Sequence, residues 1–171
     1  MKQNTARYWI VAGTVLILGA VNYSIASKER IKREGVVAFL TLAPVDPRSL
    51  MQGDYMALRF ALAQQIETQR GNINSSTDLF SKTSLDEGKT AFAELQLDGR
   101  RIATLAPAGA SGLRIRYRIR SGQVWLGTNA FFFSEGSAQR FEPARYGEFR
   151  LDTKTGEAVL VGLRDHNLAA L

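Results

Sequence analysis

The stretch LRIRYRIR, residues 113–120, alternates apolar side chains with arginine over its whole length. Successive side chains of a β-strand point to opposite faces of a sheet, so the pattern predicts a half-buried strand with one apolar and one basic face. The apolar face would hold Leu113, Ile115, Tyr117 and Ile119. The basic face would hold Arg114, Arg116, Arg118 and Arg120. No other segment of the chain has so clear a strand pattern, and it indicates a β-rich domain.

The β pattern continues on both sides of this stretch, with turn residues between the segments. Two dipeptides are typical of hairpin connections between antiparallel strands. They are Asp98-Gly99, in a loop that Arg100 lengthens, and Ser121-Gly122. The expected strands are at residues 36–42, 55–60, 91–97, 101–105, 123–126, 129–133, 147–152 and 157–163. Short connections of this kind favour a mostly antiparallel arrangement.

Helical patterns are few. Residues 60–70 predict a short helix that Gly71 ends, and a second helix is expected to begin at Ser134 and to extend no further than Pro143 allows. The polar residues 71–90 predict a mobile loop, and the three phenylalanines 131–133 are expected in the core.

The N-terminal stretch YWIVAGTVLILGAVNYSI, residues 8–25, contains no charged side chain. Eighteen residues are close to the minimum length for a helix that crosses a bilayer, and Tyr8, Trp9 and Tyr23 suit its two interfaces. We expect a retained transmembrane helix. A cleaved signal peptide and a buried core helix are the alternatives.

The whole chain is therefore predicted to be mainly β (α+β), with one N-terminal transmembrane helix followed by a single mostly antiparallel β domain that has one or two short helices. The expected organisation is a transmembrane anchor at residues 1–27, a charged juxtamembrane stalk at 28–34 and the domain at 35–171. The count of lysine and arginine favours the C-terminal flank of the span as cytoplasmic. The short, basic, acid-free N-terminus resembles an export signal-anchor instead, and on that ground we expect the domain outside the cytoplasm.

Composition excludes several kinds of site. The chain has no cysteine and one histidine, His166, so disulfides, thiolate chemistry and His-rich metal sites are excluded, and no cofactor is expected. Residues 1–34 hold six of the 22 basic and two of the 16 acidic residues, which leaves 16 basic and 14 acidic residues in the domain. A net charge of +2 does not indicate a nucleic-acid-binding domain.

Gly53-Asp54-Tyr55, with Leu58 three residues further on, resembles the signature of the GDYXXLXY family, although Phe60 stands where the family name has its last tyrosine. The resemblance extends upstream to PVDPRSLMQ and downstream to RYGEFRLD and LVGLRD, across most of residues 35–165. It implies a bacterial protein anchored in the inner membrane by a single pass, and it implies no catalytic residue.

Two candidate binding surfaces follow from the residues. The first is a loop that would present Asp46, Arg48, Ser49, Gly53, Asp54 and Tyr55 to a partner; the other interpretation is a rigid turn that these residues only cap. The second is the basic face of residues 113–120. Its arginines would either pair with neighbouring side chains, such as Glu94 with Gln96 or Glu148 with Asp152, or bind an anionic lipid, an envelope polymer or an acidic protein.

Two classes of function remain open. A tethered binding or assembly module would act beside an integral membrane protein or an envelope component. A tethered hydrolase would use Ser49 with a lysine of lowered pKa, from Lys82, Lys89 or Lys154, or a carboxylate pair drawn from Asp46, Asp54, Glu94 and Glu148. The lysines lie in polar segments where such groups are normally solvated, so the first class is favoured.

Overall fold

The computed structural model describes residues 2–43, 51–52, 55–74, 88–107, 109–110 and 112–171. The described helices are α1 (Lys2–Glu34), α3 (Ala61–Asn74) and α4 (Ala138–Phe141). The described strands are β1 (Val36–Thr41), β2 (Met51–Gln52), β3 (Tyr55–Ala57), β4 (Thr90–Leu97), β5 (Ala103–Leu105), β6 (Arg114–Arg120), β7 (Gln123–Trp125), β8 (Ala130–Phe132), β9 (Tyr146–Leu151) and β10 (Ala158–Arg164). The fold is mainly β within an α+β class, as the sequence predicts.

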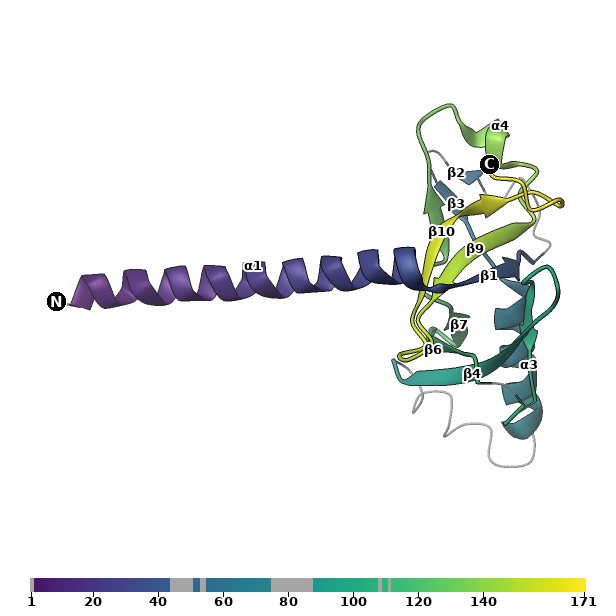
Figure 1. Cartoon of the computed structure of the whole chain (residues 1–171), viewed down its shortest axis with the longest axis horizontal. Coiled ribbons are helices and arrows are strands. Elements are labelled where there is room, and N and C mark those ends of the chain that lie inside the picture. Colours follow the sequence, from purple (N-terminus) through teal and green to yellow (C-terminus); the bar gives the residue numbers. More distant parts are fainter. Residues whose placement is uncertain (1, 44–50, 53–54, 75–87, 108, 111) are drawn as a thin grey trace.

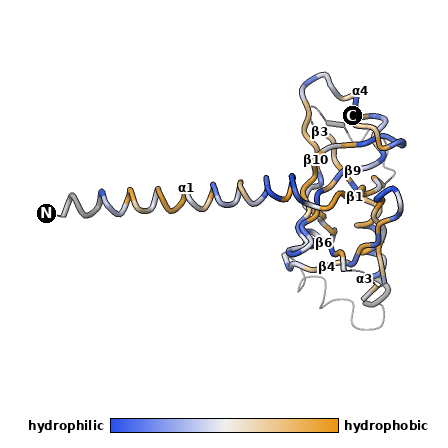
Figure 2. The backbone as a smooth tube through the Cα atoms, viewed as in Figure 1, coloured by the Kyte–Doolittle hydropathy of each residue, from blue (hydrophilic) through white to orange (hydrophobic). Residues whose placement is uncertain are grey.

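Helix α1 stands away from the rest of the chain as one long element (Figure 1). Its apolar part gives way to hydrophilic residues just before the helix reaches the domain (Figure 2). The segment Arg7–Glu34 is long and apolar enough to cross a membrane, and its apolar window is fully exposed in the structure. The helix is therefore not a core helix of this domain.

The strands form three antiparallel sheets, with the orders β1-β9-β10, β2-β3-β8 and β5-β4-β6-β7. Strand β1 links all three. The Phe39 amide donates a hydrogen bond to the Arg101 carbonyl just before β5, at 2.9 Å, and Leu42 forms an antiparallel bridge with Phe60 just after β3. Figure 1 shows β3 and α4 on one side of the α1 axis, and β4 and α3 on the other.

Strand β6 has the predicted alternation, because Ile115, Tyr117 and Ile119 are buried. The turn that follows has positive φ at both central residues, 51° at Ser121 and 73° at Gly122. Such turns match the twist of paired strands and are typical of two-residue hairpin loops. The expected hairpin of β6 and β7 is confirmed.

Both helix predictions need correction. Helix α3 does not end at Gly71 but continues to Asn74. A glycine inside a helix costs only about 1 kcal/mol, and the buried side chains of Leu62 and Ile66 hold this helix against the core. The predicted loop at 71–90 therefore begins later than expected, and residues 75–87 lie outside the described residues.

The second helix does not begin at Ser134. Gly136 has a φ of +78°, which a right-handed helix does not accommodate, and α4 covers only Ala138–Phe141. The phenylalanine prediction is correct in part. Phe131 and Phe133 pack against Phe141 at the edge of the core, but Phe132 is 74% exposed.

The centre of the core joins two segments that lie far apart in the chain. The rings of Phe60 and Phe149 meet edge to face, with centroids 5.2 Å apart, and both residues are almost fully buried. Gly147 of β9 leaves room for them. A Cβ atom there would lie 3.0 Å from Phe60 Cε1 and 3.1 Å from Phe149 Cε2. The aromatic pair therefore depends on a glycine in β9.

We expect Gly147→Ala to destabilise the full-length protein in detergent by about 1–3 kcal/mol, because the added methyl group overpacks the two rings. The measurement is the denaturant midpoint of unfolding. Gly162→Ala in β10 is the matched control, since a Cβ atom at that position meets nothing within 4 Å. Equal midpoints for the two variants would contradict this account of the core.

Candidate functional site

The structure describes only one residue of the predicted candidate loop. The other five lie outside the described residues, so their predicted roles stay predictions; they are Asp46, Arg48, Ser49, Gly53 and Asp54. Tyr55 is the first residue of β3 and is 36% exposed. Its ring lies 5.8 Å, between centroids, from the exposed ring of Phe132 in the neighbouring strand β8.

The signature segment thus has two kinds of position. Met56, Leu58 and Phe60 are buried and belong to the core, whereas Tyr55 faces outward. Phe60, which stands in place of the tyrosine in the family name, is 1% exposed and packs on Phe149. Leu58 and Phe60 of the signature therefore have a structural role, and Tyr55 lies at the surface.

Arg114, Arg118 and Arg120 of β6 are exposed and Arg116 is half-buried, but the neighbours of these arginines differ from those expected. Glu94 lies opposite Arg114 in the strand pairing, yet its carboxylate accepts backbone hydrogen bonds from Gly109 at 2.6 Å and Ala110 at 3.2 Å. Glu148 is 5% exposed and pairs with Arg164 and Arg150. Neither acidic residue neutralises the arginine face.

Each arginine of β6 has its own surroundings. The guanidinium carbon of Arg114 lies 4.9 Å from the centre of the Phe92 ring, and its Nη2 donates to the Lys154 carbonyl at 3.3 Å. Arg116 forms an ion pair with Glu157 at 3.2 Å. Arg120 lies over the ring of Trp125, with the guanidinium carbon 5.3 Å from its centre. Among the described residues Arg118 has no ion-pair partner.

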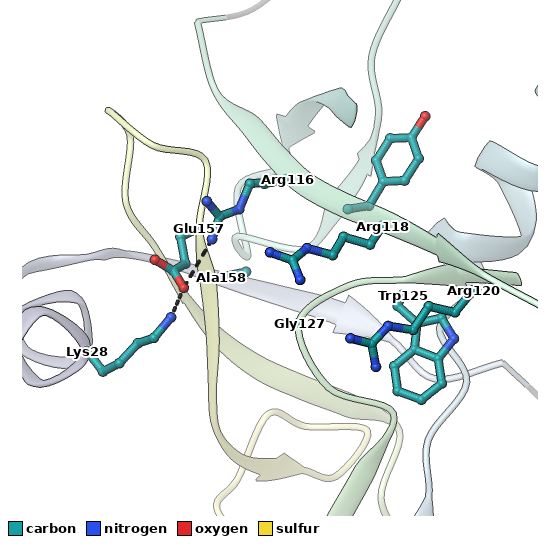
Figure 3. Close-up of a pocket in the computed structure, with 9 residues that line it drawn as sticks. Lys28, Arg116, Arg118, Arg120, Trp125, Gly127, Glu157 and Ala158 are labelled. Carbon is teal, nitrogen blue, oxygen red and sulfur yellow. Dashed lines mark ion pairs between the residues drawn. The ribbon is translucent and has the colours of Figure 1, made fainter. Parts of the chain in front are cut away.

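The last turns of α1 bring a lysine to this face. Lys28 pairs with Glu157, so that one carboxylate lies between Lys28 and Arg116 (Figure 3). These side chains surround a pocket of about 290 Å³, whose lining includes Lys28, Arg116, Arg118, Arg120, Trp125 and Glu157. We call it the basic pocket. Its charged lining comprises four cations and one carboxylate, and Figure 3 shows the three guanidinium groups on the same side of β6.

The hairpin between β9 and β10 positions Glu157. The backbone carbonyl of Gly156 accepts a hydrogen bond from the Arg116 amide at 2.6 Å, which fixes this hairpin to the edge of β6. Gly156 has a φ of +69°, and a Cβ atom there would lie 3.1 Å from the Phe92 ring. Within the turn, Asp152 accepts hydrogen bonds from the Lys154 amide at 3.0 Å and the Thr155 hydroxyl at 2.8 Å.

These hydrogen bonds, chiefly the one from the Lys154 amide, lower the pKa of Asp152 below its ordinary value of 3.8. A carboxyl group with a lowered pKa in the folded state stabilises that state above its ordinary pKa. The contribution is lost as the pH falls through the lowered pKa. Asp152 thus supports the turn at neutral pH and ceases to do so only in strong acid.

Sequence reasoning missed Lys28, Trp125 and Glu157 as members of this site. Glu157 was expected only at the start of a strand, and Lys28 only as stalk charge. Residues 28–34, the expected stalk, are the last turns of α1, and Ile31 among them is 3% exposed. Ile31 is the one apolar residue among the charged residues 28–34, and this pattern is the signal that could have predicted that these turns dock on the domain. His166, the only histidine, is exposed.

We expect Asp152→Ala to lower the thermal midpoint of the full-length protein at pH 7, since both side-chain hydrogen bonds in the turn are lost. The difference from the wild type should narrow as the pH falls from 3.8, where the carboxyl group of the unfolded chain becomes protonated, through the lowered pKa of the folded state. Asp152→Asn keeps an acceptor without the charge and should fall between the two. Thermal melts from pH 7 to pH 2.5 provide the measurement, and a difference independent of pH would contradict this role of Asp152.

Comparison with known proteins gives one match. Residues 17–163 match the model of the family described as GDYXXLXY protein. No curated protein and no solved structure matches the chain. The matched region contains the signature at Gly53–Leu58, the aromatic pair of the core and the basic pocket. The chain therefore belongs to the GDYXXLXY protein family.

Proposed function

We propose that the protein is a binding or assembly module anchored by a single pass in a bacterial inner membrane, with its domain outside the cytoplasm. It would act beside an integral membrane protein or an envelope component. One observation carries this proposal: α1 continues without a break from its exposed apolar segment into turns that dock on the domain.

That continuity gives the domain a fixed position. Ile25 is the last large apolar residue before the charged turns of α1, and Ile31 is already buried against the domain. At 1.5 Å of rise per residue, only about 9 Å of helix separates them. With α1 in a bilayer, such a domain would lie directly on the membrane surface. A short rigid connection suits an adaptor for a neighbouring membrane protein better than an enzyme that reaches for distant substrates.

The aromatic pair of Tyr55 and Phe132 is the surface that best fits a protein partner. Phe132 is 74% exposed, more than any other large hydrophobic residue described outside α1. Exposed aromatic side chains are enriched at interface hot spots, where they bury a large area at little cost in side-chain entropy. Tyr55 belongs to the family signature and directly follows Gly53-Asp54 in the chain. We therefore place the partner-binding surface at β3 and β8.

Helix α1 offers a second contact for an integral membrane partner. Small residues recur every seven positions along it, at Ala12, Gly19 and Ala26 and again at Gly13, Ala20 and Ser27. Small side chains let transmembrane helices approach closely, and a seven-residue repeat keeps them on one face. Neither glycine has a neighbouring atom within 4 Å of a built Cβ atom, so this face is open to another helix.

The alternative, a tethered hydrolase, draws no support from the described residues. Ser49 lies outside them. Of the candidate carboxylates, Glu148 is engaged by Arg164 and Arg150, and Glu94 by two backbone amides. A carboxylate held in this way is not available as a general base.

Photo-crosslinking tests the proposal in native membranes. We expect full-length protein with a benzoylphenylalanine at position 132 to form one discrete crosslinked species with an integral membrane protein. The same amino acid at position 161, where the exposed Val161 lies in β10, is the matched control and should form none. In a pull-down, Phe132→Ala should reduce recovery of that partner by about 30-fold, which corresponds to a hot spot of about 2 kcal/mol. Identical products from both positions, or undiminished recovery, would contradict this surface.

A further inference from the structure

The basic pocket carries more positive charge than the structure neutralises. Glu157 is its only carboxylate among the described lining residues, and Lys28 and Arg116 already share it. Arg118 and Arg120 are exposed, and neither forms an ion pair with a described residue. Four cations within one pocket repel one another, so an added anion would be bound favourably.

The position of the pocket along α1 indicates where that anion comes from. Lys28 follows Ile25, the last large apolar residue before the charged turns, by three residues, or about 4.5 Å of helix. The polar headgroup layer of a bilayer is about 5–7 Å thick on each side. With α1 spanning a membrane, Lys28 therefore lies at the depth of the lipid phosphates. The exposed Tyr23 fits the same interface from the apolar side.

The pocket also has the shape and chemistry for one headgroup. Its volume of about 290 Å³ is sufficient for a phosphate with its glycerol. Guanidinium groups bind phosphate oxygens through paired, charge-assisted hydrogen bonds. The Trp125 ring lies beneath Arg120 and is part of the pocket wall, and indole rings favour the boundary between apolar and polar lipid regions.

We propose that the basic pocket binds the phosphate of an anionic phospholipid, with Arg118 and Arg120 as the main ligands and Lys28 and Arg116 as its electrostatic support. The inference rests on the membrane-spanning role of α1 within the proposed function, but not on any protein partner. A bound lipid would fix the rotation of the domain about α1, and so select which side of the domain faces a neighbour in the membrane.

Trp125 provides a direct reporter. The chain has two tryptophans, so Trp9→Phe leaves Trp125 as the only one. Full-length Trp9→Phe protein in neutral detergent micelles is titrated with dihexanoylphosphatidylglycerol, dihexanoylphosphatidylcholine, inorganic phosphate or soluble polygalacturonate, and Trp125 fluorescence is recorded. We expect a saturable change with phosphatidylglycerol, none with phosphatidylcholine, and a weaker response to phosphate, which lacks an apolar part to hold it in the micelle. Added salt should weaken the binding.

Four substitutions at three positions, made in the Trp9→Phe background, locate the site. Arg118→Gln should weaken phosphatidylglycerol binding about fivefold, the effect of one basic residue near an anionic lipid, and Arg118→Lys should restore most of it. Arg140→Gln is the matched control, because it removes an equal charge from α4, on the other side of the α1 axis from β4 (Figure 1). Glu157→Gln should strengthen binding about fivefold, since it removes the only described carboxylate of the pocket. A merely disrupted pocket would not bind more tightly.

Several results would overturn the proposal. They are equal responses to the two lipids, equal weakening by Arg118→Gln and Arg140→Gln, or weaker binding after Glu157→Gln. Tighter saturation by inorganic phosphate would assign the site to a free anion, and tighter saturation by polygalacturonate would assign it to an envelope polymer. The titration contains no protein partner, so its failure leaves the crosslinking result at position 132 unaffected, and the reverse also holds.

Discussion

The close approach between the end of α1 and strand β9 is the constraint on which the arrangement of this protein depends. Gly35 allows it, because a Cβ atom there would lie 2.5 Å from the Ile31 carbonyl oxygen and 3.1 Å from the Leu151 amide. Both contacts are with backbone, which cannot move aside. The amide of Gly35 donates to the same Ile31 carbonyl at 2.8 Å, a hydrogen bond of the helical i to i−4 pattern at the end of α1. One glycine thus sets the direction in which α1 leaves the domain.

That direction determines which surfaces lie beside the helix. Ile31 is buried against the domain, so the residue three positions earlier, almost one turn away, reaches the hairpin of β9 and β10. There Lys28 meets Glu157, and Glu157 meets Arg116. A partly exposed ion pair of this kind contributes little to stability. Its larger effect is on placement, because it holds the end of the helix beside a row of arginines whose charge is only partly neutralised.

The sequence predicts what is local and periodic. The alternation of LRIRYRIR gave the buried and exposed faces of β6, and the Ser121-Gly122 turn gave its hairpin with β7. It does not predict contacts between distant segments. The partner of Arg116 comes from a turn about forty residues away, on a hairpin fixed by Gly156. The helix ends were also wrong, because tertiary packing carried α3 past Gly71 and the conformation of Gly136 delayed α4.

Two residues of the family signature, Tyr55 and Phe60, differ in role because one lies at the surface and the other in the core. Phe60 requires the space that Gly147 leaves, so a ring at this position is part of the core, where a hydroxyl group would need a buried partner. Tyr55 is 36% exposed and lies beside Phe132. A signature of this form couples a surface to the core beneath it. The buried residues Met56, Leu58 and Phe60 hold β3 against the core, where it pairs with β8. The paired strands then present the rings of Tyr55 and Phe132 at a defined position relative to α1.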